Sequence, residues 1–208
     1  ATAAGLKSTG AKDLTLIVNQ GPKNWASAVF TTNQVIAAPV IWSKEVIKGS
    51  AVRAVVLNSG GANACTGPQG FQDTHKSAEH VASLLNHSSS EIFVCSTGMI
   101  GDFLPMDKVL NGIDVIAANL SNEALLDCAE AIMTTDSIPK ISTVQASGVQ
   151  MSGIATGAGM LAPALATMLC VVMTDAVLPE KADSIFYKVP RCGKCGDFCL
   201  CTFRISGL

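Results

Sequence analysis

The sequence predicts an α/β protein, a layered sandwich of mixed sheets with flanking helices. Three short runs of apolar residues are typical of strands buried on both faces, at 14–18, 52–57 and 91–95. Between the last two runs, residues 72–85 repeat their apolar side chains at helical spacing, which predicts an amphipathic helix. Strands and helices do not alternate strictly, and no G-x-G-x-x-G sequence follows a strand. We therefore do not expect a doubly wound nucleotide-binding fold.

The remaining predicted elements complete the layers. Residues 25–30 and 34–42 are two further strand candidates, joined by a short polar turn. A helix is predicted over 105–120, because the proline that opens this range is favoured in a first helical turn. Ser121 is expected to cap a second helix. Residues 142–149 are predicted to form a strand or a hairpin.

The composition indicates a chain with a large apolar core and no charged partner. Hydrophobic residues make up 49% of the 208 positions, and charged residues only 14%. The net charge is −2 and no basic run occurs, so neither a nucleic acid nor an anionic membrane is expected as a partner. No signal peptide and no membrane-spanning run are recognisable, so we expect a cytoplasmic protein with reduced thiols.

Three segments of small residues are candidates for one shared pocket. They lie at 58–67 (NSGGANACTG), 95–101 (CSTGMIG) and 153–160 (GIATGAGM). Such segments can present several backbone N–H groups on one concave side, which suits a carboxylate or an oxyanion. One segment is weak evidence of a site, whereas three in a chain of this size favour a common pocket.

A conventional pair of nucleophile and histidine is not recognisable. His75, His80 and His87 lie on or beside one predicted helix, at spacings unlike those of a metal site, so we expect solvated side chains. A threonine needs no histidine when its own α-amine is free, because that amine can accept the hydroxyl proton. Cutting the chain between Ala166 and Thr167 would create such a threonine.

Five motifs occur in a fixed order along the chain. Their sequences are NSGGANACTG, CSTGMIG, IMTTD, GAGM and ATML, at 58–67, 95–101, 132–136, 157–160 and 166–169. Together they strongly resemble the motifs of the ornithine acetyltransferase family, the bifunctional glutamate N-acetyltransferases of the cyclic arginine pathway. The resemblance covers residues 3–177 and implies the layered α/β fold of that family.

The resemblance also implies an activity and its residues. The precursor would cut itself between Ala166 and Thr167, and the new N-terminal Thr167 would take acetyl from N-acetylornithine and pass it to glutamate. Some members of the family accept acetyl-CoA as donor. Thr97 and Gly98 match the family's oxyanion-hole pair, and Thr134 matches a substrate-binding threonine. The two cleaved chains would assemble as a heterotetramer, without a metal or a bound cofactor.

Two features depart from the family. Thr156 stands where the family has a substrate-binding lysine, and a neutral hydroxyl does not replace that charge. Residues 1–176 are expected to hold the first-chain region and the start of the second chain. Residues 177–208 are expected to be an atypical tail rather than an independent domain. Four cysteines of this tail could ligate zinc, although a truncated tail is the preferred interpretation: Cys192, Cys195, Cys199 and Cys201.

Two other functions stay open at the level of the sequence. One is an N-terminal-nucleophile aminopeptidase, which would use the same threonine. The other is a truncated, non-catalytic member of the family, which the departure at Thr156 and the tail favour.

Overall fold

The strands form two sheets in the computed structural model, which describes residues 1–21, 24–31, 33–49, 51–158, 167–176 and the backbone of 197–203. The first sheet has the order β1-β2-β3 and contains β1 (Leu14–Val18), β2 (Ala54–Gly61) and β3 (Ile92–Met99). The second has the order β4-β5-β6-β7 and contains β4 (Lys140–Ala146), β5 (Val149–Ala155), β6 (Thr167–Thr174) and β7 (Asp197–Phe203). The pairs β2–β3 and β6–β7 are parallel, and the other neighbours are antiparallel.

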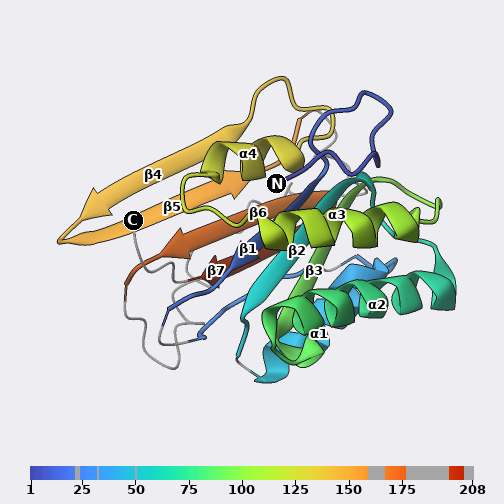
Figure 1. Ribbon diagram of the computed structural model, residues 1–208, viewed down its shortest axis with the longest axis horizontal. Coiled ribbons are helices and arrows are strands. Elements are labelled where there is room, and N and C mark those ends of the chain that lie inside the picture. Colours follow the sequence, from blue (N-terminus) through green and yellow to red (C-terminus); the bar gives the residue numbers. More distant parts are fainter. Residues whose placement is uncertain (22–23, 32, 50, 159–166, 177–196, 204–208) are drawn as a thin grey trace.

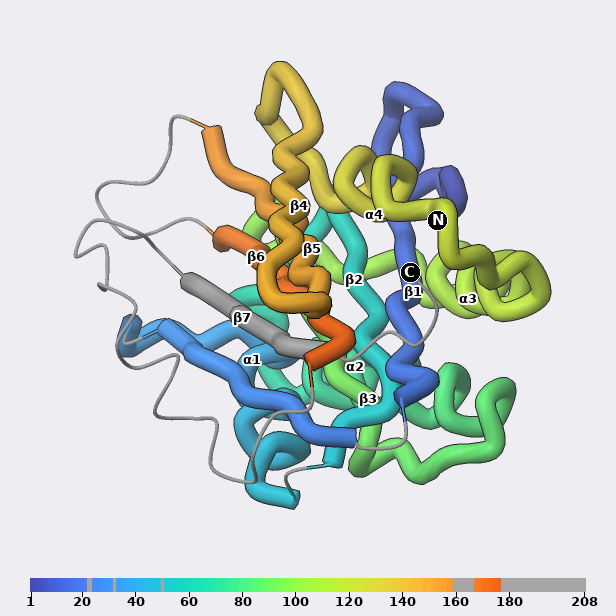
Figure 2. The backbone as a smooth tube through the Cα atoms, turned by 90° about the vertical axis from the view of Figure 1, so that its left-hand side faces the viewer, coloured from blue at the N-terminus to red at the C-terminus, as the bar shows by residue number. Residues whose placement is uncertain are grey.

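The helices of the described residues surround the first sheet. They are α1 (Ala38–Val46), α2 (Gly67–Leu85), α3 (Met106–Ala118) and α4 (Leu125–Ala131), with two 3₁₀ turns at Ile47–Gly49 and Ser89–Glu91. Figure 1 shows α2 and α3 on one side of the first sheet and the β4–β5 hairpin on the other. Figure 2 shows β4, β5 and β6 together in one layer, as their pairing requires. No described helix combines the length and the apolar character that crossing a bilayer requires.

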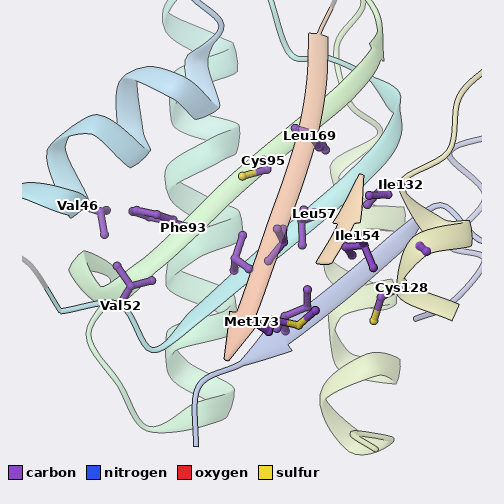
Figure 3. Packing of buried hydrophobic residues seen from close by; sticks show 14 residues of the cluster. Val46, Val52, Leu57, Phe93, Cys95, Cys128, Ile132, Ile154, Leu169 and Met173 are labelled. Atoms are coloured by element: carbon purple, nitrogen blue, oxygen red, sulfur yellow. The ribbon is translucent and has the colours of Figure 1, made fainter. Parts of the chain in front are cut away.

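Two apolar cores hold these layers together. Along β2, Val55 and Leu57 belong to the cluster between the two sheets, whereas Ala54 and Val56 belong to the cluster under α2 and α3. Both faces of this strand are buried, which explains its continuous apolar run. Figure 3 shows the cluster between the sheets, where Phe93 is fully buried. The layered α/β fold predicted from the sequence is thereby confirmed.

The two strand predictions before residue 43 are wrong. Residues 25–31 and 33–37 contain no strand beyond a single bridge from Trp25 to Ala51, and helix α1 begins at Ala38. Proline stands in the first turn of α1, a position where its missing N–H costs nothing. The helix buries Pro39, Ser43 and Val46, which have the i, i+4, i+7 spacing of a helix rather than the period of a strand.

The segment after α3 also differs from its prediction in one respect. Helix α4 begins at Leu125, and the hydroxyl of Ser121 accepts a hydrogen bond from the N–H of Glu123 at 3.2 Å, so Ser121 is not its cap. Of the two structures predicted for 142–149, a strand or a hairpin, the hairpin is confirmed, and its strands extend over 140–155. β4 and β5 are joined at Ser147 and Gly148, which both have positive φ, as a two-residue hairpin turn requires.

Candidate active site

Thr97 and Thr167 are in direct contact although 70 residues separate them in the chain. Their hydroxyl oxygens lie 2.6 Å apart, and Thr97 Oγ1 also donates to the carbonyl of Thr167 at 3.3 Å. Thr97 lies on β3 and is 1% exposed, and Thr167 is the first residue of β6. The contact exists because β3 and β6 pack against each other across the two sheets. Ala166 lies outside the described residues.

Gly98 follows Thr97 at a position where the backbone needs a glycine. Its φ is +125°, and a Cβ there would lie 2.6 Å from the carbonyl carbon of Gly60. The pairing of β2 with β3 is irregular at this point, with a bulge between Gly60 and Gly61. Thr97 and Gly98 therefore lie where the pairing of two parallel strands is interrupted by a bulge, and Thr97 contacts the Thr167 hydroxyl. Their assignment as an oxyanion-hole pair stays a prediction.

The polar residues that begin the 58–67 and 95–101 segments, Asn58 and Ser96, are buried within strands rather than in loops. The 58–67 and 95–101 segments begin as continuations of β2 and β3. Inside the sheet, Ser96 Oγ donates to Asn58 Oδ1 at 2.6 Å, and Asn58 Nδ2 donates to the carbonyl of Gly61 at 3.0 Å. These bonds satisfy the buried polar groups and allow the strands to extend beyond their apolar runs.

Asp136 is the centre of a second polar cluster, which sequence reasoning missed. Its Oδ2 accepts from Thr156 Oγ1 at 2.7 Å and from the N–H of Thr134 at 3.1 Å. Its Oδ1 accepts from the N–H of Gly157 at 2.8 Å and from the Lys140 ammonium. Asp136 falls in one of the five sequence motifs, but nothing in the local pattern assigned it a partner.

The charge of Asp136 is held in place by these donors. Burial alone would raise the pKa of the Asp136 carboxyl. The hydrogen bonds from Lys140, from Thr156 and from the N–H groups of Thr134 and Gly157 outweigh burial and lower that pKa to about 2. The carboxylate is therefore ionised at neutral pH and joins the segment at Thr134 to the end of β5.

The structure thus brings the candidate residues together in two groups. Thr134 is exposed and Thr156 is buried, and both contact Asp136. The N–H of Thr156 donates to the carbonyl of Leu169 at 2.8 Å, and Leu169 is two residues from Thr167 on β6. The Asp136 group is therefore linked through β6 to the Thr97–Thr167 pair. The substrate-binding roles of Thr134 and Thr156 stay predictions.

Replacing Thr156 with valine tests this link. The variant removes one donor to a buried carboxylate, and a hydrogen bond to a charged group contributes about 1.5–3 kcal/mol. We expect the free energy of unfolding in urea to fall by about 2 kcal/mol. Thr143→Val is the matched control, because Thr143 is exposed and bonds only to the neutral Ser152 hydroxyl. Equal losses in the two variants would contradict the role of Thr156.

The histidines and cysteines provide no metal site within the described residues. The imidazole of His80 pairs with Asp114 at 2.7 Å, and its side chain is 31% exposed. The His75 ring packs against Trp42 and is 44% exposed, and His87 is exposed. The prediction of solvated helix-face histidines is consistent with these positions. The zinc hypothesis concerns side chains of the tail that lie outside the described ones.

Solved structures define the class of this fold. The ornithine acetyltransferase of Mycobacterium tuberculosis, solved in complex with ornithine, matches with a TM-score of 0.70 and 43% identity, over 80% of this chain and 89% of that one. The arginine biosynthesis bifunctional protein ArgJ of Bacillus halodurans matches with a TM-score of 0.68 and 35% identity, over 80% and 87%. The class is that of the ornithine acetyltransferase fold. The chain belongs to the ArgJ family, whose model matches residues 1–189.

Curated relatives agree with this family assignment. The arginine biosynthesis bifunctional protein ArgJ of Streptomyces coelicolor is 55% identical over 179 residues, which are 86% of this chain and 47% of that protein. The protein of the same name from Thermobifida fusca is 53% identical over 184 residues, which are 88% of this chain and 48% of that protein. The chain thus spans about half the length of the curated relatives it matches.

Proposed function

We propose that this chain carries the nucleophile half of an ornithine acetyltransferase, which moves acetyl from N-acetylornithine to glutamate in arginine biosynthesis. The observation that carries the proposal is the 2.6 Å contact between the hydroxyls of Thr97 and Thr167, in a chain of the ArgJ family. This contact supports the proposal, because a hydroxyl at the start of a strand can serve as the nucleophile and the buried hydroxyl beside it can donate to a developing oxyanion.

The first step is self-cleavage between Ala166 and Thr167. The Thr167 hydroxyl attacks the carbonyl carbon of Ala166, the C–N bond breaks, and the freed amine takes the hydroxyl proton. Water then hydrolyses the resulting ester, which restores the hydroxyl and releases Ala166 as a carboxylate. An α-amine has a pKa of about 7.7–8.0 in model peptides, so a useful fraction of the Thr167 amine is neutral at cellular pH.

Acetyl transfer follows the same chemistry. The neutral amine takes the proton of the Thr167 hydroxyl while the hydroxyl oxygen attacks the carbonyl carbon of the acetyl group of N-acetylornithine. The acetyl C–N bond breaks, and ornithine leaves with the proton. The amine of glutamate then attacks the acetyl-enzyme, and N-acetylglutamate leaves as the threonine regains its proton. Thr97 and Gly98 stabilise the oxyanion of each tetrahedral intermediate, and acetyl-CoA is an alternative donor in the same scheme.

The surroundings of the nucleophile complete the proposal. Thr134 and Thr156, held by Asp136, form the substrate-binding wall. Residues 1–176 hold the first-chain region and the start of the second chain. The partners are the other chain of the precursor, in a heterotetramer, and small amino-acid substrates. The protein acts in the cytoplasm without a metal or bound cofactor.

Mass spectrometry of the purified protein tests the proposal. Incubation should release a fragment that begins at Thr167, and N-acetylornithine should then acetylate that residue. Thr167→Ala should abolish both, with a loss of at least about 10³-fold in acetyl transfer, because no nucleophile remains. Thr167→Ser keeps the hydroxyl and should retain part of both. Thr174→Ala, on the same strand, should leave the cut unchanged.

Each other outcome counts against the proposal. Hydrolysis of small amino-acid amides in place of acetyl transfer would identify an N-terminal-nucleophile aminopeptidase. A folded chain that stays intact and transfers no acetyl would identify a non-catalytic member of the family.

A further inference from the structure

A small cavity lies against the candidate nucleophile. Its volume is about 20 Å³, and it is lined by Thr167 and Met168 of β6, by Pro39 and Val40 of α1, and by Phe30. A cavity needs about 10–15 Å³ to hold a single water molecule, so this one accommodates one group of about that size. Its walls come from both sheets and from α1, which makes it a feature of the packed fold rather than of one loop.

The lining favours an apolar occupant over a water molecule. A buried water requires two to four polar partners. Ser43 Oγ, at the edge of the cavity, is already engaged in both directions with Val94, donating to its carbonyl at 3.0 Å and accepting from its N–H at 3.2 Å. Ser96 Oγ donates to Asn58 Oδ1. The polar side chains next to the cavity are therefore satisfied by the protein itself.

We infer that this cavity receives the methyl group of the acyl chain carried on Thr167, and that it restricts the enzyme to acetyl. The inference rests on the proposed function, because it assumes that Thr167 is acylated. A methyl group attached to the acyl carbon on Thr167 Oγ1 starts beside the cavity and is close to a water molecule in size. Propionyl and butyryl chains are larger than this volume, and the lining residues Cys95 and Leu169, labelled at one end of the cluster in Figure 3, belong to the core between the sheets.

The expected preference for acetyl over longer acyl chains follows from the rate effects of single methylene groups in hydrophobic pockets. One methylene in such a pocket changes a rate by roughly 10- to 200-fold. Here the longer chain must push aside residues packed in the core between the sheets, so discrimination should lie within that range for propionyl and be larger for butyryl. Val40 is the lining residue whose truncation should best reduce this discrimination between acyl chains. Its side chain is only partly buried, so truncation enlarges the cavity with a modest loss of stability.

Acylation by p-nitrophenyl acetate, propionate and butyrate tests the inference on the purified protein. The three esters share a leaving group, and peptide mass spectrometry counts only the acyl groups on Thr167. We expect acetyl to react roughly 10- to 200-fold faster than propionyl. Val40→Ala should raise the propionyl-to-acetyl ratio by at least about tenfold. Val46→Ala is the matched control on the same helix, because Val46 is buried but does not line the cavity.

The possible outcomes distinguish failure of the cavity assignment from failure of the proposed function. Equal rates for the three esters in the wild type would overturn the cavity assignment and leave the acetyl-enzyme standing. A propionyl-to-acetyl ratio that Val40→Ala leaves unchanged, or that Val46→Ala raises as much, would also overturn it. If no ester acylates Thr167 in protein that circular dichroism shows to be folded, both the cavity and the proposed function are wrong.

Discussion

We expect Gly98→Ala to lower the free energy of unfolding by about 3 kcal/mol or more, and to abolish acylation of Thr167. Two costs add at this position. The φ of +125° is a conformation that an L residue adopts only with strain of about 1–3 kcal/mol. The new Cβ would also lie 2.6 Å from the carbonyl carbon of Gly60 and 2.8 Å from its nitrogen. Overpacking against atoms that cannot rotate away typically costs about 1–3 kcal/mol more.

Gly101→Ala separates the two costs. Gly101 also has a positive φ, +94°, but a Cβ there meets no atom within 4 Å. Its substitution should cost only the backbone strain, and it should leave the contact between Thr97 and Thr167 intact. Urea unfolding of both variants measures the difference. If Gly98→Ala is no less stable than Gly101→Ala, the close approach of β2 and β3 at Gly98 does not hold in solution.

The sequence predicted the layers better than the strand ends. The apolar runs in β1, β2 and β3 indicate burial on both faces, and that pattern is local. The polar residues that follow, such as Asn58 and Ser96, also suggest loops locally. They lie within strands because each satisfies the other across the parallel pair, and that partner is 38 residues away in the chain. The 34–42 segment is apolar enough for either structure, and Pro39 was the available signal for a helix.

The site depended even more on distant contacts. Thr97 and Thr167 come together only when two sheets pack face to face, so no periodicity in the sequence could pair them. The family motifs named both residues without giving their contact. Asp136 went unassigned for a related reason. Its partners Thr156 and Gly157 follow it by about twenty residues, across the β4–β5 hairpin, whereas the nearer partner Lys140 resembles an ordinary surface charge.

Asp136→Asn should have the second large effect, a loss of about 3 kcal/mol in the free energy of unfolding. The Asp136 side chain is 1% exposed, and its two oxygens accept four hydrogen bonds. An amide offers one acceptor oxygen and turns an NH₂ group toward donors, so donors of the cluster are left unpaired. Unpaired buried groups cost about 1–3 kcal/mol each. Lys140 is 43% exposed and can return to water, which keeps the loss below that of a fully buried ion pair.

Asp127→Asn is the matched control for this substitution. Asp127 also pairs with a lysine, Lys12, at 2.6 Å, but its side chain is 44% exposed. Exposed ion pairs contribute at most about 1 kcal/mol. The change from Asp to Asn should therefore hardly alter the free energy of unfolding at Asp127 and should lower it strongly at Asp136. Similar losses at the two positions would show that burial and the four donors do not matter.

The stabilisation by the Asp136 carboxylate should decrease as the pH falls. The folded pKa of about 2 lies below the ordinary value of 3.8 for an aspartate, so the carboxylate stabilises the fold above pH 3.8 and this stability is lost as the pH falls toward 2. The shift corresponds to about 2 kcal/mol. The stability difference between wild type and Asp136→Asn, measured by urea unfolding, should therefore be constant from pH 5 to 7 and shrink by about 2 kcal/mol between pH 4 and 2. A difference that does not change with pH would mean that the charge of Asp136 is not what holds Thr156 and Gly157 in place.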